Sequence, residues 1–529
     1  MKDCTIKRFA SVCDLELQSD AQQQQAKPSS SLKPSLSDVS PRQLHRLALA
    51  ALICMAFMVS SLVVTVSTGT DIRIYNDIKA SLGIDMDETT ETWDRAQQQE
   101  LAQEDTDDRL REFQRAKLHR EFALSFAHYA QQATEPRGLV LPLFDDIAHL
   151  GLSVILELRA LGMDLPIEIP HCGDFKPEFQ QMIQSRDPLV RVYDVCEQAL
   201  AATNILGPGR KLFCSSEHQC HQRFRGFSIK IISVVFSQFQ EIMLIDADTL
   251  FFQNPLVLWD SESYKQTGTL FFHDRISSDD IFLALPVGNT SDGQPISSMH
   301  TYLSNFDVAP YHQLASIPRK QRTVKSPDTT PHVPLSFEPS DFLLSSHSWN
   351  MRAGHEMDSS LVLWNKAKQS RATAILASFL ALNGLPLPPS YGDKEFFFIA
   401  CELAETQYAF SNHGVGSLGT DVREYEGRTN AMLCGSGLHY LPTKGGRSSD
   451  AQLLYVNSDD LLVLNVEDDE IYRSVAQPAE FYPGSFGAKG IRQECAFDLE
   501  ALPLTADEKA KIARRQQFHQ TVSSWTLTP

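Results

Sequence analysis

The sequence EIMLIDADTLFFQNP runs from Glu241 to Pro255. Its apolar run, Ile242 to Ile245, ends in two aspartates that flank a single alanine. In an extended strand alternate side chains point the same way, so Asp246 and Asp248 are expected to share one face. Two converging carboxylates need a positive charge to neutralise them. Hard divalent cations such as Mg²⁺ and Mn²⁺ take carboxylate oxygens and also bridge to diphosphate oxygens.

The sequence before this stretch alternates between strand and helix patterns. Segments 137–146, 165–171 and 188–193 have the pattern of apolar strands, and 148–163 and 226–240 have helical periodicity. A strand, helix, strand order predicts a parallel α/β sheet. Ligands of such sheets bind at the carboxyl ends of the strands, which is where the aspartate pair is expected to lie.

Length and charge narrow the class of protein. The chain has 529 residues with 42% hydrophobic residues, which predicts one large globular domain with additional segments. Its formal net charge of -19 argues against a general nucleic-acid binder, because phosphate contacts need clustered Lys and Arg. Small molecules, glycans or metal ions are the expected partners.

The N-terminal region predicts a membrane anchor. No charge interrupts the run from Leu47 to Val66, which is about long enough to cross a ~30 Å hydrocarbon core as a helix. Arg42 and Arg46 precede it and Asp71 follows it, so the positive-inside tendency places the N-terminus in the cytosol. The tail before the span is rich in Gln, Ser and Pro and is expected to be disordered. The large C-terminal part is therefore expected to be lumenal.

A polar segment follows the expected span. Within it Leu118, Phe122 and Phe126 recur at helical spacing, which predicts either a helical stem or a helix packed on the main domain. The region from Asp279 to Ser348 is rich in Ser and Pro with little periodicity, and it is expected to be a long loop on the binding face. The expected organisation is a tail at 1–46, a span at 47–66, a stem at 67–135 and a catalytic domain at 136–529 with an insertion at about 279–348.

Cysteines and a sequon are compatible with a lumenal domain. Seven cysteines lie beyond the span, so at least one cannot pair within the chain. Cys214 and Cys220 are close enough in sequence to close a small disulfide loop, and buried free thiols are the ordinary expectation for the others. Asn289 begins an Asn-Thr-Ser sequon in a turn-rich stretch, where it is expected to be exposed and able to carry a glycan.

The block GFSIKIISVVFSQFQEIMLIDADTLFFQNPLVLWDSESYKQTGTLFFHDR, residues 226–275, resembles the signature block of the yeast-type α-1,3-mannosyltransferases. The similarity covers most of Arg137 to Leu464, with SYGDKEFFFIACELAE and LCGSGLHYLP in family order. It implies a GT-A-like, Rossmann-like mixed sheet flanked by helices in a single-pass type II Golgi membrane enzyme. It also implies a Mn²⁺ (or Mg²⁺) site, GDP-mannose as donor, a mannosylated glycan as acceptor, and retention at the transferred sugar.

The resemblance also implies roles for individual residues. Asp246 and Asp248 would bind the metal, and His439 in GLHYLP would complete its ligand set, since imidazole is a reasonable Mn²⁺ ligand. The alternative for His439 is an ordinary core or surface histidine. Lys230, on the helix before the strand, would approach the nucleotide or its phosphates, and its alternative is a solvated lysine on the helix face.

A second acidic motif, YGDKEFF, is expected at a helix N-terminus. Asp393 or Glu395 would reach the transferred sugar, with Asp393 favoured, although the helix dipole alone also favours carboxylates there. In HEMDSSLVLWNK the family often has Glu-x-Gly-Gln, whereas this chain has Asp358, Ser360 and Leu361. This departure leaves the donor sugar less certain than the fold.

Two other functions remain open at the level of the sequence. One is a transferase that uses another nucleotide sugar, such as a UDP-sugar. The other is a noncatalytic lumenal glycan-binding subunit, which the presence of both aspartates, His439 and the GDKE segment disfavours. For the transferase, the metal and basic groups would take up charge as the sugar–phosphate bond breaks, and a leaving-group phosphate oxygen would accept the acceptor's proton. Such a reaction needs no protein general base.

Overall fold

The computed structural model describes residues 115, 117–207, 209–276, 280–319, 333–382, 384–424, 431–443, 451–467, 469–479 and 495–525. The predicted tail, membrane span and most of the predicted stem lie outside these residues. Within the described ranges, none of the helices combines the length and apolarity needed to cross a membrane.

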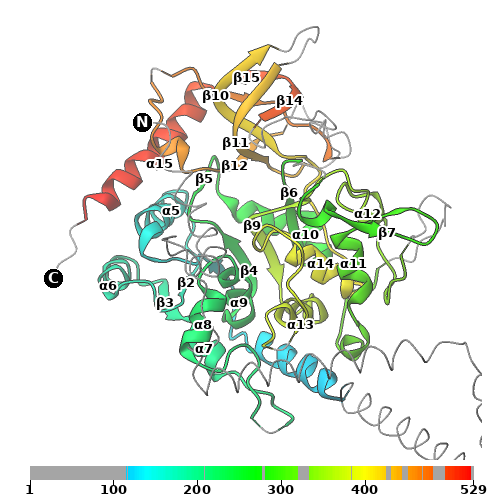
Figure 1. Cartoon of the computed structure of the whole chain (residues 1–529). Coiled ribbons are helices and arrows are strands. Elements are labelled where there is room, and N and C mark those ends of the chain that lie inside the picture. Colours follow the sequence, from blue (N-terminus) through cyan, green and yellow to red (C-terminus); the bar gives the residue numbers. More distant parts are fainter. Residues whose placement is uncertain are drawn as a thin grey trace, which may run out of the picture. The chain divides into compact units, whose positions relative to one another are not determined.

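A six-stranded mixed sheet forms the centre of the molecule, in the order β3-β2-β1-β4-β9-β6 (Figure 1). Strands β1 to β4 are parallel, and β9 runs antiparallel to both of its neighbours, β4 and β6. The predicted α/β class is confirmed, and the strands and helices predicted before the Asp-Ala-Asp stretch all form. The strands are β1 (Glu135–Val140), β2 (Ile167–His171), β3 (Val190–Asp194), β4 (Phe239–Ile245), β6 (Thr269–His273) and β9 (Met357–Asn365).

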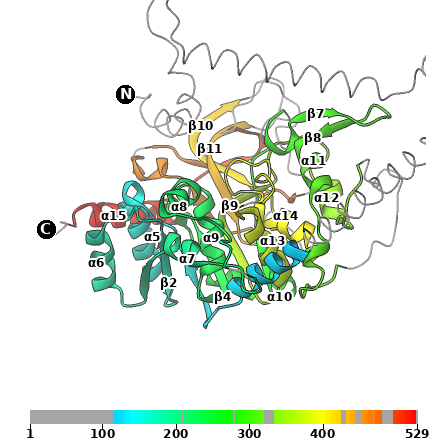
Figure 2. The ribbon, with the colours of Figure 1, turned by 60° about the horizontal axis from the view of Figure 1, so that its bottom comes forward.

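Helices cover both faces of this sheet (Figure 2). Alternate residues of β4 enter two different cores: Ile242 and Leu244 pack with helices α9, α13 and α14, whereas Met243 and Ile245 pack with α5. This two-sided burial explains why the strand is a continuous apolar run. The helices are α5 (Ala148–Ala160), α6 (Pro177–Arg186), α7 (Val195–Ala201), α8 (Glu217–Phe224), α9 (Ser228–Phe236), α10 (Glu262–Thr267), α11 (Ser298–Asn305), α12 (Asp341–Ser345), α13 (Ser370–Phe379), α14 (Phe396–Leu403) and α15 (Ala506–Ser523).

A second sheet lies above the first in Figure 1 and has the order β15-β13-β10-β11-β12-β5, with β14 paired to β11. Its strand β5 starts at Thr249, directly after the Asp-Ala-Asp turn, and pairs with β12. The turn therefore joins the two sheets. The strands are β5 (Thr249–Phe251), β10 (Gly416–Glu424), β11 (Ala431–Tyr440), β12 (Leu453–Asn457), β13 (Tyr472–Ser474), β14 (Cys495–Leu499) and β15 (Ala501–Pro503).

The helix that contains Phe122 and Phe126 packs on the main domain. Residues 117–130 are helical, and Phe126 is buried in the same core as α9 and α13. The Ser125 hydroxyl donates to Asn204 Oδ1 at 2.9 Å, and the backbone nitrogen of Thr203 donates to the Tyr129 hydroxyl at 3.0 Å. Of the two expectations for this segment, the structure therefore has the packed helix.

The segment at about 279–348 contains more regular structure than the loop that its composition predicts. It includes a hairpin of β7 (Pro286–Asn289) and β8 (Pro295–Ser297), followed by α11 and later by α12. Met299 and Leu303 of α11 are buried in the main core, which anchors the segment. Asn289 lies at the end of β7 and is exposed, as expected for the residue that begins the sequon.

Six of the described cysteines form disulfides: Cys172 with Cys196, Cys214 with Cys220, and Cys434 with Cys495. The 214–220 bridge was expected from its spacing. Cys401 is free and buried. The expectation of buried free thiols is therefore wrong for four of the five remaining cysteines, because the fold brings together segments that are distant in sequence.

Candidate active site

The Asp-Ala-Asp turn lies at the carboxyl end of β4 and is held by backbone from both sheets. The Asp246 nitrogen donates to the Ser360 carbonyl of β9 at 2.9 Å. On the other side, the Ser458 nitrogen donates to the Asp248 carbonyl at 3.0 Å. With its amide nitrogen facing Asp248, Asn457 donates to both carboxylate oxygens at 3.0 and 2.6 Å. The two aspartates are thus held in place at the junction of the sheets.

Lys230 neutralises the first of these aspartates. Its Nζ lies 2.7 Å from Asp246 Oδ1 and 2.9 Å from Asp246 Oδ2, and 3.4 Å from Asp393 Oδ1. The Lys230 side chain is only 12% exposed, so it is not the solvated lysine that was its alternative. Burial opposes its charge, but Asp246 and Asp393 outweigh burial and raise the pKa of Lys230 above its usual value.

Negative charge exceeds positive charge around Lys230. Burial raises the pKa of Asp246 to about 6, with Lys230 opposing this shift. Burial and the neighbouring Asp246 raise the pKa of Asp248 to about 7. Burial also raises the pKa of Asp393, against the effect of Lys230. One ammonium cannot offset three carboxylates at this edge of the sheet, so the site favours additional positive charge.

Asp393 and Glu395 are brought to different surroundings. Asp393 is 1% exposed, and its Oδ2 has no hydrogen-bond partner among the described residues. Glu395, by contrast, accepts backbone hydrogen bonds from Glu356 at 3.1 Å and Met357 at 3.3 Å. Its Oε1 also lies 3.4 Å from His355 Nδ1. Asp393 thus keeps one buried acceptor unused, whereas both oxygens of Glu395 are engaged with the start of β9.

His439 comes from β11 of the second sheet and is 2% exposed. Its Nε2 lies 2.8 Å from Asp358 Oδ2, and its ring stacks on Tyr455 with centroids 4.5 Å apart. His439 outweighs burial and holds the pKa of Asp358 well below its usual range. Asp358, first noted as a departure from the family pattern, is therefore the partner of His439. Ser360 from the same pattern donates its hydroxyl to the Tyr455 hydroxyl at 3.1 Å.

Three contacts of the site were missed by sequence reasoning. Lys394 forms an ion pair with Asp274, which follows β6. Ser359 of β9 has its hydroxyl 3.3 Å from Lys230 Nζ. Arg515 of α15, 1% exposed, donates to the Ala247 carbonyl at 3.2 Å, between the two aspartates. Lys394 stands in the quoted GDKE motif and could have been considered, but no pattern in the sequence connects residue 515 with residue 247.

Arg515 is anchored to α5 as well as to the turn. Its Nη2 donates to the Leu150 carbonyl at 3.2 Å, its Nη1 donates to the Ser153 hydroxyl, and its Nε lies 3.5 Å from Glu157 Oε2. The guanidinium presents several donors in a fixed planar arrangement, which suits this set of acceptors. It therefore connects helix α5 with the middle of the aspartate turn.

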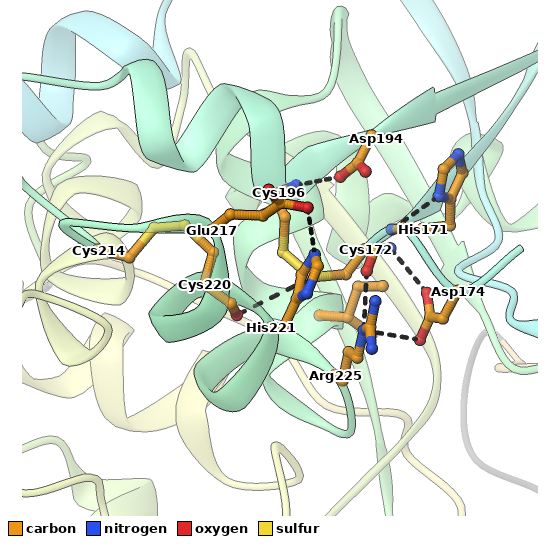
Figure 3. The surroundings of a disulfide bond; sticks show 12 residues. His171, Cys172, Asp174, Asp194, Cys196, Cys214, Glu217, Cys220, His221 and Arg225 are labelled. Carbon is orange, nitrogen blue, oxygen red and sulfur yellow. Dashed lines mark hydrogen bonds and ion pairs between the residues drawn. A yellow bond between two sulfur atoms is a disulfide. The ribbon is translucent and has the colours of Figure 1, made fainter.

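The carboxyl ends of β2 and β3 add further charged residues to the same edge of the sheet. Figure 3 shows His171, Asp174, Asp194 and Arg225 around the Cys172–Cys196 disulfide. Asp174 Oδ1 accepts from the Cys172 nitrogen at 2.9 Å, and Arg225 donates to the Cys172 carbonyl at 2.9 Å. The disulfide joins Cys172, directly after β2, to Cys196 in the first turn of α7, which follows β3, so it fixes the spacing of these two strand ends.

The donor set suits a divalent cation in charge but supplies few ligands. No group of three or more His, Cys, Asp and Glu in the described ranges is arranged to hold a metal ion. Asp246 and Asp248 remain as candidate carboxylate ligands, and His439 Nε2 is engaged with Asp358. Mg²⁺-type sites commonly use one or two carboxylates and take their other ligands from substrate phosphates and water. The aspartate pair fits that kind of site.

The similar proteins of known sequence share one description, alpha-1,3-mannosyltransferase. The chain is 25% identical over 302 residues to "Putative alpha-1,3-mannosyltransferase MNN14" of Candida albicans, covering 56% of this chain and 37% of the relative. It is 23% identical over 334 residues to alpha-1,3-mannosyltransferase MNT2 of Saccharomyces cerevisiae, covering 61% and 51%. With MNT3 of the same yeast it shares 26% over 377 residues, covering 67% and 53%. The chain thus spans between about a third and about half of the length of these relatives.

Similar solved structures are more distant. The WbbM bifunctional glycosyltransferase matches with a TM-score of 0.28 and 10% identity, over 52% of this chain and 38% of that one. Mouse xyloside xylosyltransferase 1 matches with a TM-score of 0.26 and 11% identity, over 52% and 85%. TM-scores this low carry no argument about the fold, which is therefore described from the strand order of the two sheets.

The family model described as "Mannosyltransferase putative" matches residues 136–441. This range is more than half of the 529 residues and contains Lys230, the aspartate pair, Asp393 and His439. The family resemblance predicted from the sequence is confirmed, and with it the prediction of a glycosyltransferase at the level of the family. The chain belongs to this mannosyltransferase family.

Proposed function

We propose that this protein transfers mannose from GDP-mannose to a mannosylated glycan, forming an α-1,3 linkage with retention of configuration. Family membership supports mannosyl transfer. The observation that carries the proposal is the half-buried pair of Asp246 and Asp248 at the carboxyl edge of the sheet, beside Lys230. Such an edge is where α/β proteins bind nucleotides.

We further propose that Asp246 and Asp248 hold Mn²⁺ or Mg²⁺ together with the diphosphate oxygens of the donor. A bound divalent cation stabilises the negative charge that develops on a departing nucleoside diphosphate. In this proposal His439 would be a third ligand through Nδ1, because its Nε2 is engaged with Asp358, or through Nε2 only after it leaves Asp358. The raised pKa values of the aspartate pair support the need for this additional charge.

The proposed roles of the other residues follow from their contacts. Lys230 would hold Asp246 in place and contribute positive charge near the phosphates. Asp393 would accept a hydrogen bond from a hydroxyl of the transferred sugar through its unpartnered Oδ2. Glu395 was predicted to share this role, but its engaged oxygens favour a positioning role in which it fixes the first residues of β9.

The finer description of the fold and location belongs to the same proposal. A GT-A-like fold is supported by the four parallel strands followed by an antiparallel strand beside β4. A single-pass type II position in the Golgi membrane, with a lumenal catalytic domain, is supported by the apolar run at 47–66 and by three disulfides, which are typical of oxidising compartments.

The test is to incubate the full chain with Mn²⁺, a panel of GDP- and UDP-sugars, and a set of mannosides. The expected product is an α-1,3-mannosyl extension made from GDP-mannose alone, identified by mass and NMR. Transfer from a UDP-sugar instead would replace the proposed donor. Glycan binding without hydrolysis or transfer of any donor would make the protein a noncatalytic subunit.

A further inference from the structure

Three aromatic side chains from separate segments meet beside Asp393. The ring centroids of Phe227 and Tyr391 are 5.5 Å apart, and those of Phe282 and Tyr391 are 5.6 Å apart. Phe227 and Tyr391 are each 44% exposed, while Phe282 is half-buried. We call Phe227, Phe282 and Tyr391 the aromatic platform. Exposing an aromatic ring to water costs free energy, so aromatic rings that cluster while partly exposed are typical of binding surfaces.

The chain ties the platform to the charged residues of the site. Phe227 immediately precedes α9, and its carbonyl accepts from the Lys230 nitrogen at 3.2 Å, so the two residues are one turn apart. Tyr391 is two residues before Asp393, which limits the separation of their Cα atoms to about 7.6 Å. Lys230 and Asp393 are themselves paired at 3.4 Å. The platform therefore lies next to the place where the donor sugar is proposed to bind.

Gly392 permits the close approach of two of these segments. Its φ of +67° is in the left-handed region, and a Cβ at this position would lie 2.7 Å from Phe227 Cγ. A side chain there would push Phe227 away and strain the turn that carries Asp393. The contact between Phe227 and the Tyr391–Asp393 turn thus depends on glycine.

Phe282 is held in a conformation that its side chain disfavours. Its φ is +46°, which is uncommon for a bulky residue other than glycine. The ring packs on His355 with centroids 4.7 Å apart, and the Ser298 hydroxyl donates to the Phe282 carbonyl. Strain of this kind persists where surrounding contacts enforce it, and it is frequent at ligand sites. Since His355 also contacts Glu395, Phe282 is connected to the GDKE motif.

From these contacts we infer that the aromatic platform binds the apolar face of a sugar ring of the acceptor glycan. This inference rests on the proposed glycosyl transfer. A pyranose presents C–H bonds on its faces and hydroxyls around its rim. The C–H bonds suit the electron-rich faces of Phe227 and Tyr391.

A sugar ring is the occupant that the size and borders of the platform favour. Three rings, one of them half-buried, provide much less than the ~800 Å² per partner that a stable protein interface buries. The charged residues at the border, Asp393 and the Lys394–Asp274 pair, suit a small ligand with many hydroxyls. A second copy of this chain on the same surface is an outcome that the experiment detects.

The test measures steady-state kinetics of the full chain with GDP-mannose as donor and methyl α-mannopyranoside as acceptor. Phe227→Ala and Tyr391→Ala are each expected to raise the acceptor KM about tenfold, because each removes one stacking face. Tyr391→Phe keeps the ring and is expected to stay within about twofold of wild type. Leu189→Ala is the matched control, since Leu189 is 42% exposed but lies just before β3, at the opposite edge of the sheet.

Each outcome decides between the inferences. An acceptor KM that is unchanged in both alanine variants, while the wild type transfers mannose, overturns the platform alone. A donor KM that rises as much as the acceptor KM indicates general damage to the site and also overturns it. Altered association of the variants in size-exclusion chromatography, with unchanged acceptor KM, replaces the sugar by a second copy of the chain. A wild type that neither hydrolyses nor transfers any donor overturns the proposed function, and the platform with it.

Discussion

At Asp248 a carboxylate is held where its negative charge is disfavoured. Burial and the charge of Asp246 raise its pKa to about 7, although Asn457 donates to both of its oxygens. A group whose folded pKa lies above its unfolded value binds more protons in the folded state. The folded protein without a bound cation is therefore expected to lose stability as pH rises from about 4 to about 7.

The first prediction is that Asp248→Asn raises the stability of the cation-free protein but lowers its turnover. At pH 7.5 the gain is expected to be on the order of 2 kcal/mol, and the loss of stability between pH 4 and 7 should become smaller. Turnover should fall about 10²-fold to 10³-fold, as for loss of a well-placed electrostatic group. Thermal denaturation across pH, together with a Mn²⁺ titration of turnover, measures both effects. Near-normal turnover with unchanged cation dependence would remove Asp248 from the metal site.

At the scale of single residues, the sequence indicated the acidic pair Asp246 and Asp248 but not the lysine that neutralises Asp246. Lys230 was expected near phosphates, and the structure pairs it with Asp246. His439 was expected at the metal, and it is paired with Asp358, which the sequence presented only as a departure from a pattern. Such pairings depend on strand register and on which strands become neighbours. For example, the pairing of β11 with β12 places His439 opposite Tyr455. A single sequence does not specify them.

At the scale of elements, helix α15 is structurally part of the site although it lies beyond the residues that the family model matches. It packs along α5, as Figure 2 shows, and it carries Arg515 to the Ala247 carbonyl. Burial raises the pKa of Glu157, the partner of Arg515, to about 7, and the two arginines of α15 oppose this shift. The aspartate turn thus depends on a contact between two helices.

The second prediction is that Arg515→Lys lowers kcat by at least tenfold while Arg515→Met also destabilises the protein by roughly 3 kcal/mol. Lysine keeps the charge opposite Glu157 but lacks the planar set of donors that reaches both α5 and Ala247. Lys511→Ala is a suitable control, because the ion pair of Lys511 is with the exposed Asp507 on the same helix. Melting temperatures and kcat are measured for all three. An Arg515→Lys protein with wild-type kcat would show that Arg515 does not position the turn.

Helices and strands that a local apolar pattern marks were predicted well. The pairing of strands that are distant in sequence was not predicted. The apolar run of β4 and the helical periodicity of α9 lie within a few residues of the motif that they position. By contrast, the sequence does not show that β9 inserts between β4 and β6, or that β5 leaves the first sheet for the second. The region at 279–348 appeared irregular because its hairpin is short and solvent-exposed, so little apolar alternation marks it.

At the scale of the whole molecule, the disulfides and the exposed sequon agree with the proposed lumenal domain. The third prediction is that Asn289→Gln removes one glycosidase-sensitive increment of mass from the chain made in a secretory pathway, because Asn289 is exposed on its hairpin.

A fourth prediction concerns topology: the catalytic domain should resist protease added outside sealed microsomes, and only the tail before Leu47 should be cleaved. Gel mobility before and after each treatment gives the result. Protection of the tail with loss of the domain would reverse the proposed topology.

The contact between Arg515 and Ala247 also has a consequence for biosynthesis. The two residues are 268 positions apart. At about 5–20 residues per second, translation reaches Arg515 roughly a quarter of a minute to one minute after the aspartate turn is made. The central sheet can be complete during this interval while the turn still lacks its donor from α15. A nascent or prematurely terminated chain would therefore carry the acidic motif without its support, and full turnover is expected only after the helix at 506–523 has been translated and has docked.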